Sequence, residues 1–111
     1  MTQGIFVVSA ARSAIGPFGG SLKDVPLTQL AATVVREAIR RSGAPPDRIG
    51  HVVMGNVIAT EPRDAYLARV AAVEAGVAPE ASAYHVNLLC GSGLHAILLA
   101  AQTLRSARRQ R

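Results

Sequence analysis

The spacing of hydrophobic positions changes along the chain between two kinds of period, and these changes predict alternating strands and helices. Short apolar runs at residues 5–8, 51–54 and 84–86 are typical of buried strands. After Pro26, apolar residues recur every three or four positions as far as Gly43. This pattern predicts a helix with a first-turn proline and a glycine just beyond its C-terminus.

The second half of the chain continues this alternation. A helix is expected over residues 62–74, with Gly76 just after its end. Residues 94–104 are apolar on nearly all sides, which predicts a helix buried within the protein. The resulting order β-α-β-α-β-α indicates an α/β fold with largely parallel strands. No internal repeat or linker divides the sequence.

The composition is that of one small cytoplasmic domain. The chain has 111 residues, of which 50% are hydrophobic and only 4% aromatic, so its core is expected to consist of Ala, Val, Leu and Ile. No apolar run reaches the roughly 20 residues that a membrane span requires, and the N-terminus does not resemble a secretory signal. The single cysteine excludes an internal disulfide and fits a reducing compartment.

The net charge of +5 comes mostly from the end of the sequence. Residues 105–111 include four arginines, whereas residues 1–104 carry eight basic and seven acidic groups. We therefore expect residues 105–111 to be a basic, disordered tail outside the folded domain of residues 1–104. Without interleaved aromatic residues, this tail gives little reason to expect nucleic-acid binding. One cysteine and three scattered histidines also lack the spacing of a metal site.

The one cysteine, Cys90, lies between the last predicted strand and the last predicted helix. Free N–H groups and the positive end of the helix dipole favour a thiolate at such a place. Gly91 and Gly93 would let a large substrate approach the sulfur, and the N–H groups can stabilise a developing oxyanion. Cys90 is thus a candidate nucleophile for acyl transfer. A buried cysteine that packs as a small hydrophobic side chain is an equally good interpretation of its position.

A general base for Cys90 is not evident in the sequence. His95 would lie about 140° from Cys90 around a helix, and His85 would lie roughly 16 Å away along an extended strand. His51 stands at the beginning of another strand, and no acidic residue accompanies any of these histidines in a triad-like pattern. The sequence therefore predicts a nucleophile whose proton acceptor is missing.

Several segments together resemble the thiolase family. Residues 86–97, VNLLCGSGLHAI, are similar to the thiolase signature that surrounds the nucleophilic cysteine. Upstream, the segments ARSAIGPFGGSLKDVP, VVMGNVI and TEPRDAYLARVAAVEAGV are similar to the N-terminal part of thiolases. The last of these segments is most similar to bacterial β-ketothiolases. The resemblance covers residues 5 to about 104.

The resemblance implies a thiolase-like layered fold, of which this chain would hold the incomplete first half of the N-terminal domain. It implies acyl transfer between coenzyme A thioesters, by Claisen condensation or thiolytic cleavage, in reactions such as those of fatty acid metabolism. Cys90 would carry the acyl group, and its N–H would help to form an oxyanion hole. Coenzyme A thioesters would be substrates, with no separate cofactor and no metal.

The resemblance also implies partners for the chain. The catalytic histidine and second cysteine of a thiolase lie in a second half of the protein, so this chain is expected to be truncated and inactive alone. Homo-oligomers or association with a second thiolase half are expected, whereas nucleic-acid and membrane partners are not. Leu88 departs from the Arg or Lys that the family usually has there. A non-catalytic partner of a full-length thiolase and a ketosynthase remain as alternatives.

Overall fold

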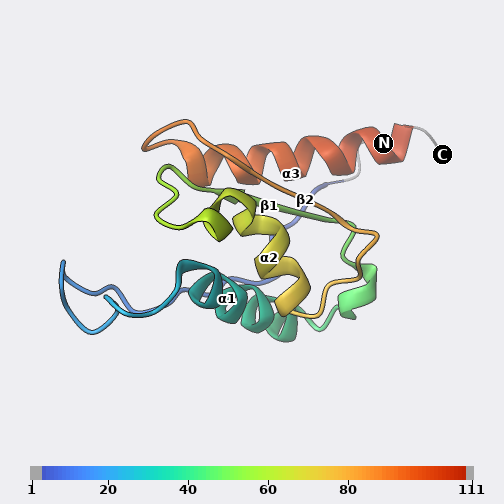
Figure 1. Cartoon of the computed structure of the whole chain (residues 1–111). Coiled ribbons are helices and arrows are strands. Elements are labelled where there is room, and N and C mark those ends of the chain that lie inside the picture. Colours follow the sequence, from blue (N-terminus) through green and yellow to red (C-terminus); the bar gives the residue numbers. More distant parts are fainter. Residues whose placement is uncertain (1–3, 110–111) are drawn as a thin grey trace.

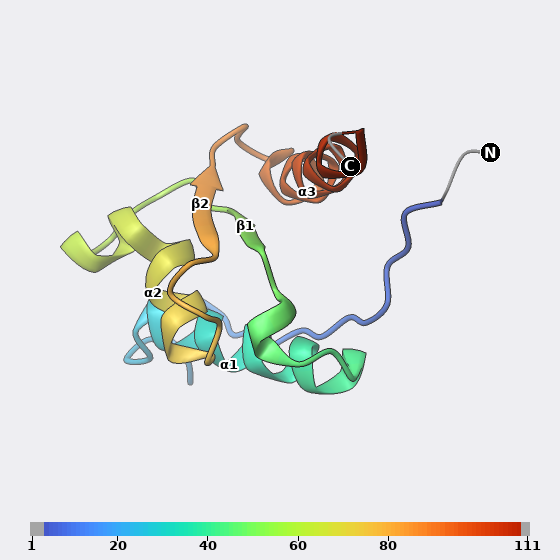
Figure 2. The same ribbon diagram turned by 90° about the vertical axis from the view of Figure 1, so that its right-hand side faces the viewer.

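The computed structural model describes residues 4–109 and has three layers. Two helices cover one face of a small sheet, and a third helix lies on the other face (Figures 1 and 2). The elements in chain order are helix α1 (Leu27–Ser42), a 3-10 turn (Pro46–Arg48), strand β1 (His51–Gly55), a second 3-10 turn (Pro62–Tyr66), helix α2 (Leu67–Glu74), strand β2 (Ser82–Val86) and helix α3 (Ser92–Arg109). The expected α/β class is confirmed.

The sheet consists of β1 and β2, which pair in parallel with His51 opposite Ser82 and Gly55 opposite Val86. Both strands were predicted, and the structure extends each of them by one or two residues. The connection between them contains α2, as a parallel pair requires. Both strands therefore end at the same edge of the sheet, next to the turn that follows β2.

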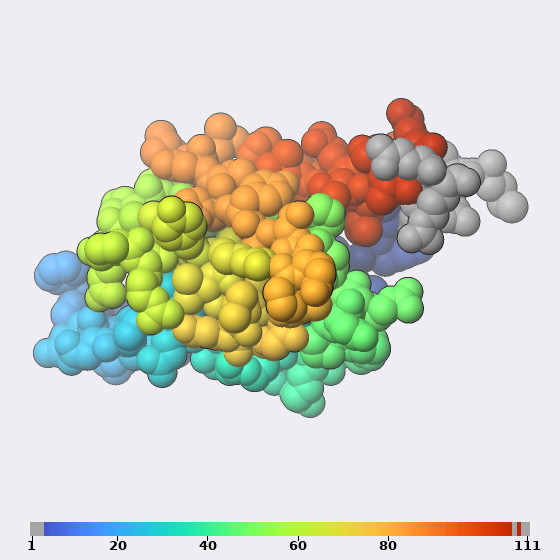
Figure 3. All heavy atoms as spheres, turned by 45° about the vertical axis from the view of Figure 1, so that its right-hand side comes forward, coloured from blue at the N-terminus to red at the C-terminus, as the bar shows by residue number. Residues whose placement is uncertain are grey.

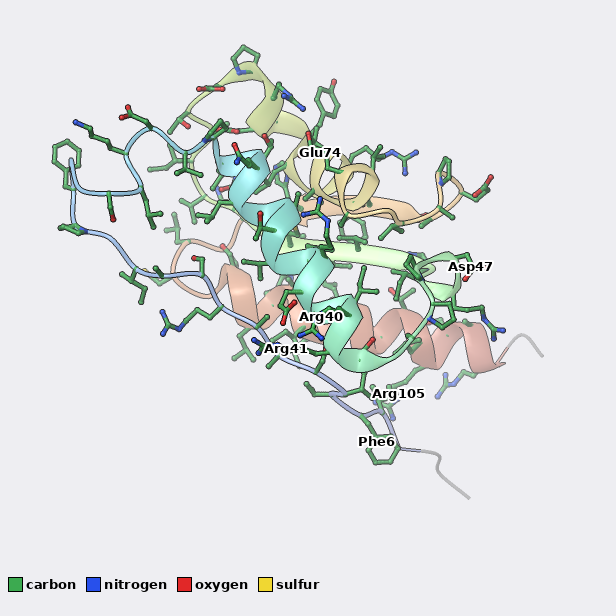
Figure 4. The ribbon with its side chains drawn as sticks, turned by 90° about the horizontal axis from the view of Figure 1, so that it is seen from below. Phe6, Arg40, Arg41, Asp47, Glu74 and Arg105 are labelled. Carbon is green, nitrogen blue, oxygen red and sulfur yellow. The ribbon has the colours of Figure 1, made fainter. Side chains whose placement is uncertain are left out.

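The strand predicted at residues 5–8 is absent, and that prediction is wrong. The segment pairs with neither described strand, and the side chains of residues 6–8 are exposed, with Phe6 at 78%. Just after this segment the chain passes α1, where the Ser9 hydroxyl donates to the Ala38 carbonyl and Arg41 donates to the Ala10 carbonyl (Figure 4). An apolar run becomes a strand only where a neighbouring strand supplies hydrogen bonds, and neither described strand pairs with these residues.

The first predicted helix agrees closely with α1. Pro26 directly precedes its first residue, and Gly43 follows its last with φ 72° and donates to the Arg40 carbonyl. This left-handed conformation is the one that glycine adopts without steric cost. The predicted helix 62–74 is divided into a 3-10 turn and α2, but its bounds are correct.

Helix α3 differs from its prediction at both its end and its surface. It continues to Arg109, so residues 105–109 are helical rather than a disordered tail, while residues 110–111 lie outside the described residues. Good helix formers without Gly or Pro explain this extension. The helix is also not buried, because large side chains such as Leu94, at 67% exposure, face outward. Figure 3 shows α3 along the outside of the molecule.

The core is built of small aliphatic side chains between α2 and the sheet. Its buried cluster consists of Val52, Ala68, Ala72, Val77 and Ala81. The alanines of α2 allow the helix to approach the strands closely, because they extend only one carbon from the backbone.

No helix within residues 4–109 is long and apolar enough to cross a membrane.

The turn before α2 is held by a buried carboxylate. Asp64 is 2% exposed and accepts hydrogen bonds from the Thr60 hydroxyl, the Thr60 N–H and the Glu61 N–H at 2.7–3.0 Å. These hydrogen bonds, above all the one from the Thr60 hydroxyl, hold the pKa of the Asp64 carboxyl below its ordinary value of 3.8. Burial alone would raise this pKa, but the hydrogen bonds outweigh it. The ionised form of Asp64 therefore stabilises the folded chain.

This carboxylate predicts acid sensitivity. The pKa of Asp64 is lower in the folded chain than in the unfolded chain. Its contribution to the free energy of unfolding is therefore complete above the pKa of the unfolded chain, and it is lost as the pH falls through the pKa of the folded chain. We expect the free energy of unfolding to fall as pH is lowered below about 5 in urea titrations.

Hydrogen bonds from Arg40 and Arg41 also lower the pKa of Glu37, to about 2, so Glu37 adds an acid dependence of its own. The effect of Asp64 is therefore best measured in a chain that carries Glu37→Gln. There, Asp64→Asn is expected to lower stability at pH 7 and to flatten the remaining acid dependence. An unchanged acid dependence in that variant would contradict the assignment.

Candidate functional site

The turn that carries Cys90 lies at the carboxyl edge of the sheet, between β2 and α3 (Figure 1). The segment after β1 is tied to it, because the Asn56 N–H donates to the Val86 carbonyl at 3.0 Å and the Asn87 side chain donates to the Val57 carbonyl at 3.4 Å. Binding sites of open α/β sheets lie outside the carboxyl ends of their strands. The position of Cys90 is the usual one for a functional residue in this fold class.

The backbone of this turn is strained at Leu89. Its φ of 48° is the only positive value for a residue other than glycine among the described residues. Such a conformation costs a side-chain-bearing residue of order 1–3 kcal/mol and persists only where the surroundings enforce it. Here the Asn87 side-chain oxygen accepts the Leu89 N–H at 2.9 Å, and Ser92 binds the Leu89 carbonyl.

Cys90 is exposed, and it stands two residues before the first residue of α3. The structure thus confirms that it lies at the beginning of this helix. The interpretation of Cys90 as a buried hydrophobic side chain is wrong, since the turn directs it away from the core. Neighbouring Leu88, where thiolases usually have a basic residue, is exposed as well.

Three backbone N–H groups in the turn and the first turn of α3 have no acceptor among the described residues. Within residues 4–109, no carbonyl or side chain accepts the N–H of Cys90, Gly93 or Leu94. Free donors of this kind are usual in the first turn of a helix, where they favour a nearby negative charge. They can therefore serve a thiolate or an oxyanion beside Cys90.

The two glycines beside Cys90 are not required by the backbone. Neither Gly91 nor Gly93 has a positive φ, and a Cβ on Gly93 would meet no atom within 4 Å. On Gly91 the nearest atom would be 3.4 Å away, which is an ordinary contact. A glycine in a helix is destabilising relative to alanine by about 0.5–1 kcal/mol. Their effect here is to leave the surface next to the thiol open.

None of the three histidines forms a hydrogen bond with Cys90 in the described part of the chain. His51 begins β1, whose five residues place it roughly 15 Å from the carboxyl edge. His85 lies within β2 opposite Met54, and His95 is half-buried in α3. Where the proton acceptor of Cys90 lies therefore stays a prediction. Residues 4–109 also contain no group of three side chains that could hold a metal ion.

Two residues that shape this site were not predicted from the sequence. Ser92 is buried beneath the turn, and Gly55 ends β1 in direct contact with the first turn of α3. Both have recognisable signals, namely a serine at the first position of a helix and a glycine at the end of a strand. Only the three-dimensional structure shows that the two residues meet.

Comparison with known proteins gives a consistent result. The family model for the thiolase N-terminal domain matches residues 5–110. The chain is 62% identical over 104 residues to the β-ketothiolase BktB of Cupriavidus necator, covering 94% of this chain and 26% of that protein. It is 42% identical over 100 residues to an acetyl-CoA acetyltransferase of the same organism, covering 90% and 25%.

Solved structures give the same picture. The human mitochondrial 3-ketoacyl-CoA thiolase, solved in complex with CoA, superposes with a TM-score of 0.86 at 35% identity over 89% of this chain and 25% of that one. The chain thus spans about a quarter of the length of the relatives it matches. These matches favour thiolases over the ketosynthase alternative.

The geometry predicts that Cys90 reacts in the native state. Because the thiol is exposed, iodoacetamide is expected to alkylate the folded chain once, as read by intact mass, and not to alkylate Cys90→Ala. The same reaction in urea gives the reference rate for an unprotected thiol. A native chain that stays unmodified while the unfolded chain reacts completely would contradict the exposed position.

Proposed function

Since the chain belongs to the thiolase family, we propose that it supplies the acyl-carrying nucleophile of a thiolase and that this nucleophile is Cys90. The observation that carries the proposal is the exposed thiol on a strained turn, beside backbone N–H groups without acceptors. The proposed substrates are acyl-CoA and β-ketoacyl-CoA thioesters, which would react without a bound cofactor. A free, exposed thiol also supports the reducing cytoplasm as the place of the reaction.

In the proposed first step, the Cys90 thiolate attacks the carbonyl carbon of an acyl-CoA thioester. A bond forms between Sγ and this carbon, and negative charge passes to the carbonyl oxygen, to which the N–H groups of Cys90, Gly93 and Leu94 can donate. Collapse of this intermediate breaks the bond to the sulfur of coenzyme A, which leaves as a thiolate and takes up a proton. The products are an acyl-cysteine and free coenzyme A.

The second step needs a proton acceptor. In condensation, the acceptor removes a proton from the α-carbon of a second acyl-CoA, whose carbanion attacks the acyl-cysteine and releases the Cys90 thiolate. General acid–base assistance contributes roughly 10²- to 10⁴-fold to such a step. No described histidine forms a hydrogen bond with Cys90, so we propose that the acid and base groups come from the part of a thiolase that this chain does not contain.

A second candidate function is non-catalytic association with a thiolase. The observation that favours it is the row of apolar side chains on α3 that are at least half exposed, namely Leu94, Ile97, Leu98 and Leu104. Both functions use the same surface, because a second thiolase half or another copy of the chain would cover it. They differ in whether Cys90 becomes acylated.

The first functional prediction is that this chain alone does not cleave acetoacetyl-CoA. We expect no loss of enolate absorbance when the chain, acetoacetyl-CoA and coenzyme A are combined, because the second step lacks its base. Turnover that disappears in Cys90→Ala would contradict the proposal that the base lies elsewhere.

A chimaera makes the test sharper. This chain can replace the matching quarter of the Cupriavidus necator β-ketothiolase, to which it is 62% identical. The chimaera is expected to cleave acetoacetyl-CoA, and Cys90→Ala within it to lose that activity. A folded chimaera that keeps its activity with Cys90→Ala would contradict the role of Cys90.

The second functional prediction concerns association. Because Leu94, Ile97 and Leu98 are all more than half exposed on α3, we expect sedimentation to show species larger than the monomer at micromolar concentration. Leu94→Gln with Leu98→Gln is expected to shift the chain toward monomer. The matched control is Ile15→Gln, an exposed apolar position outside α3. A sharp monomer peak with a cooperative thermal transition in the unmodified chain would contradict this prediction.

A further inference from the structure

We propose that Ser92 is a positioning residue for Cys90: its buried hydroxyl, fixed against the end of β1, holds the turn in the conformation that presents the thiol. The role in acyl transfer rests on the function proposed above. The role in shaping the turn rests on geometry alone.

The Ser92 hydroxyl makes two hydrogen bonds within the turn. It accepts the Leu88 N–H at 2.8 Å and donates to the Leu89 carbonyl at 2.6 Å. The Ser92 N–H also donates to the Leu89 carbonyl, at 3.1 Å. Ser92 therefore binds the peptide group after Leu89, the strained residue directly before Cys90, and the peptide group that joins Asn87 to Leu88.

Ser92 can act as a fixed point because it is buried and contacts the sheet. It is 4% exposed, and no buried polar side-chain atom of the described residues lacks a partner. A Cβ placed on Gly55 would lie 2.6 Å from the Ser92 carbonyl carbon and 2.7 Å from the Gly93 nitrogen. No side chain fits at Gly55, so the backbone of β1 directly supports the first turn of α3.

These contacts link the sheet to the thiol in three steps. Gly55 sets the position of Ser92, the Ser92 hydroxyl sets the peptides around Leu89, and the conformation of Leu89 sets the direction of Cys90. Without the hydroxyl, the Leu88 N–H loses its acceptor and Leu89 can relax to a negative φ. Cys90 would then turn relative to the N–H groups of α3 that are proposed to hold the oxyanion.

The test compares Ser92→Ala with Ser92→Thr, which keeps the hydroxyl, and with Ser106→Ala, which removes an exposed serine from the same helix. The first readout is hydrogen exchange of the Leu88 amide, resolved by mass spectrometry. Loss of the hydrogen bond is expected to speed this exchange roughly three- to tenfold in Ser92→Ala only. The second readout is acylation of Cys90 by phenyl thioacetate, an activated thioester, which is expected to slow by about tenfold in Ser92→Ala.

Ser92→Thr keeps the hydroxyl and is expected to show the same rates of Leu88 amide exchange and Cys90 acylation as the unmodified chain. If the added methyl group prevents folding, Gly55→Ala provides a second route. It should displace Ser92 and slow acylation, whereas Gly50→Ala, where a Cβ would meet no atom within 4 Å, should not.

The inference is overturned if Ser92→Ala matches Ser106→Ala in both exchange and acylation. It is also overturned if Ser92→Ala speeds exchange at Leu88 but leaves acylation unchanged, because the hydroxyl would then be structural only. If the unmodified chain forms no acyl adduct, the proposed function fails instead. The positioning role is then decided by Leu88 exchange together with the alkylation rate of Cys90.

Discussion

The candidate site depends on one contact, in which the end of β1 touches the first turn of α3. Gly55 has no side chain, so its backbone reaches that of Ser92 and Gly93. This contact holds α3 on the face of the sheet opposite α1 and α2 (Figure 1). The turn after β2 must then close between a fixed strand and a fixed helix, and the positive φ of Leu89 is how it does so. The exposure of Cys90 follows from that geometry.

Local signals in the sequence predicted much of the fold. Pro26 and Gly43 bound α1 because each acts through its own backbone conformation, which needs no tertiary information. The prediction failed where long-range partners decide the outcome. The apolar run at residues 5–8 has the composition of a strand but no strand beside it. Helix α3 has the composition of a buried helix, yet it packs against β1 and β2 on one side and leaves Leu94, Ile97 and Leu98 exposed.

In the candidate site, too, local features could be predicted from the sequence and long-range contacts could not. Cys90 could be found from the sequence, because a single thiol between a strand and a glycine-rich helix start is a local pattern. The support that Ser92 and Gly55 give to the turn could not be found from the sequence, because these residues meet only when β1 and α3 pack together. The exposed apolar side chains of α3 fit a chain that spans about a quarter of its relatives. Family resemblance, rather than pattern, is what indicated that further chemical groups lie elsewhere.

The parallel pairing of β1 and β2 has a consequence for the order of folding. Helices α1 and α2 can form from neighbouring residues, but the two strands meet only after the whole connection through α2 has closed on itself. The turn with Cys90 is anchored at both ends by this late event, through β2 on one side and through the β1–α3 contact on the other. In a growing or refolding chain we therefore expect helical turns to appear before the turn with Cys90 is organised. The proposed nucleophile is thus expected to be among the last features to mature, and until then Cys90 is expected to behave as an ordinary cysteine of a flexible chain.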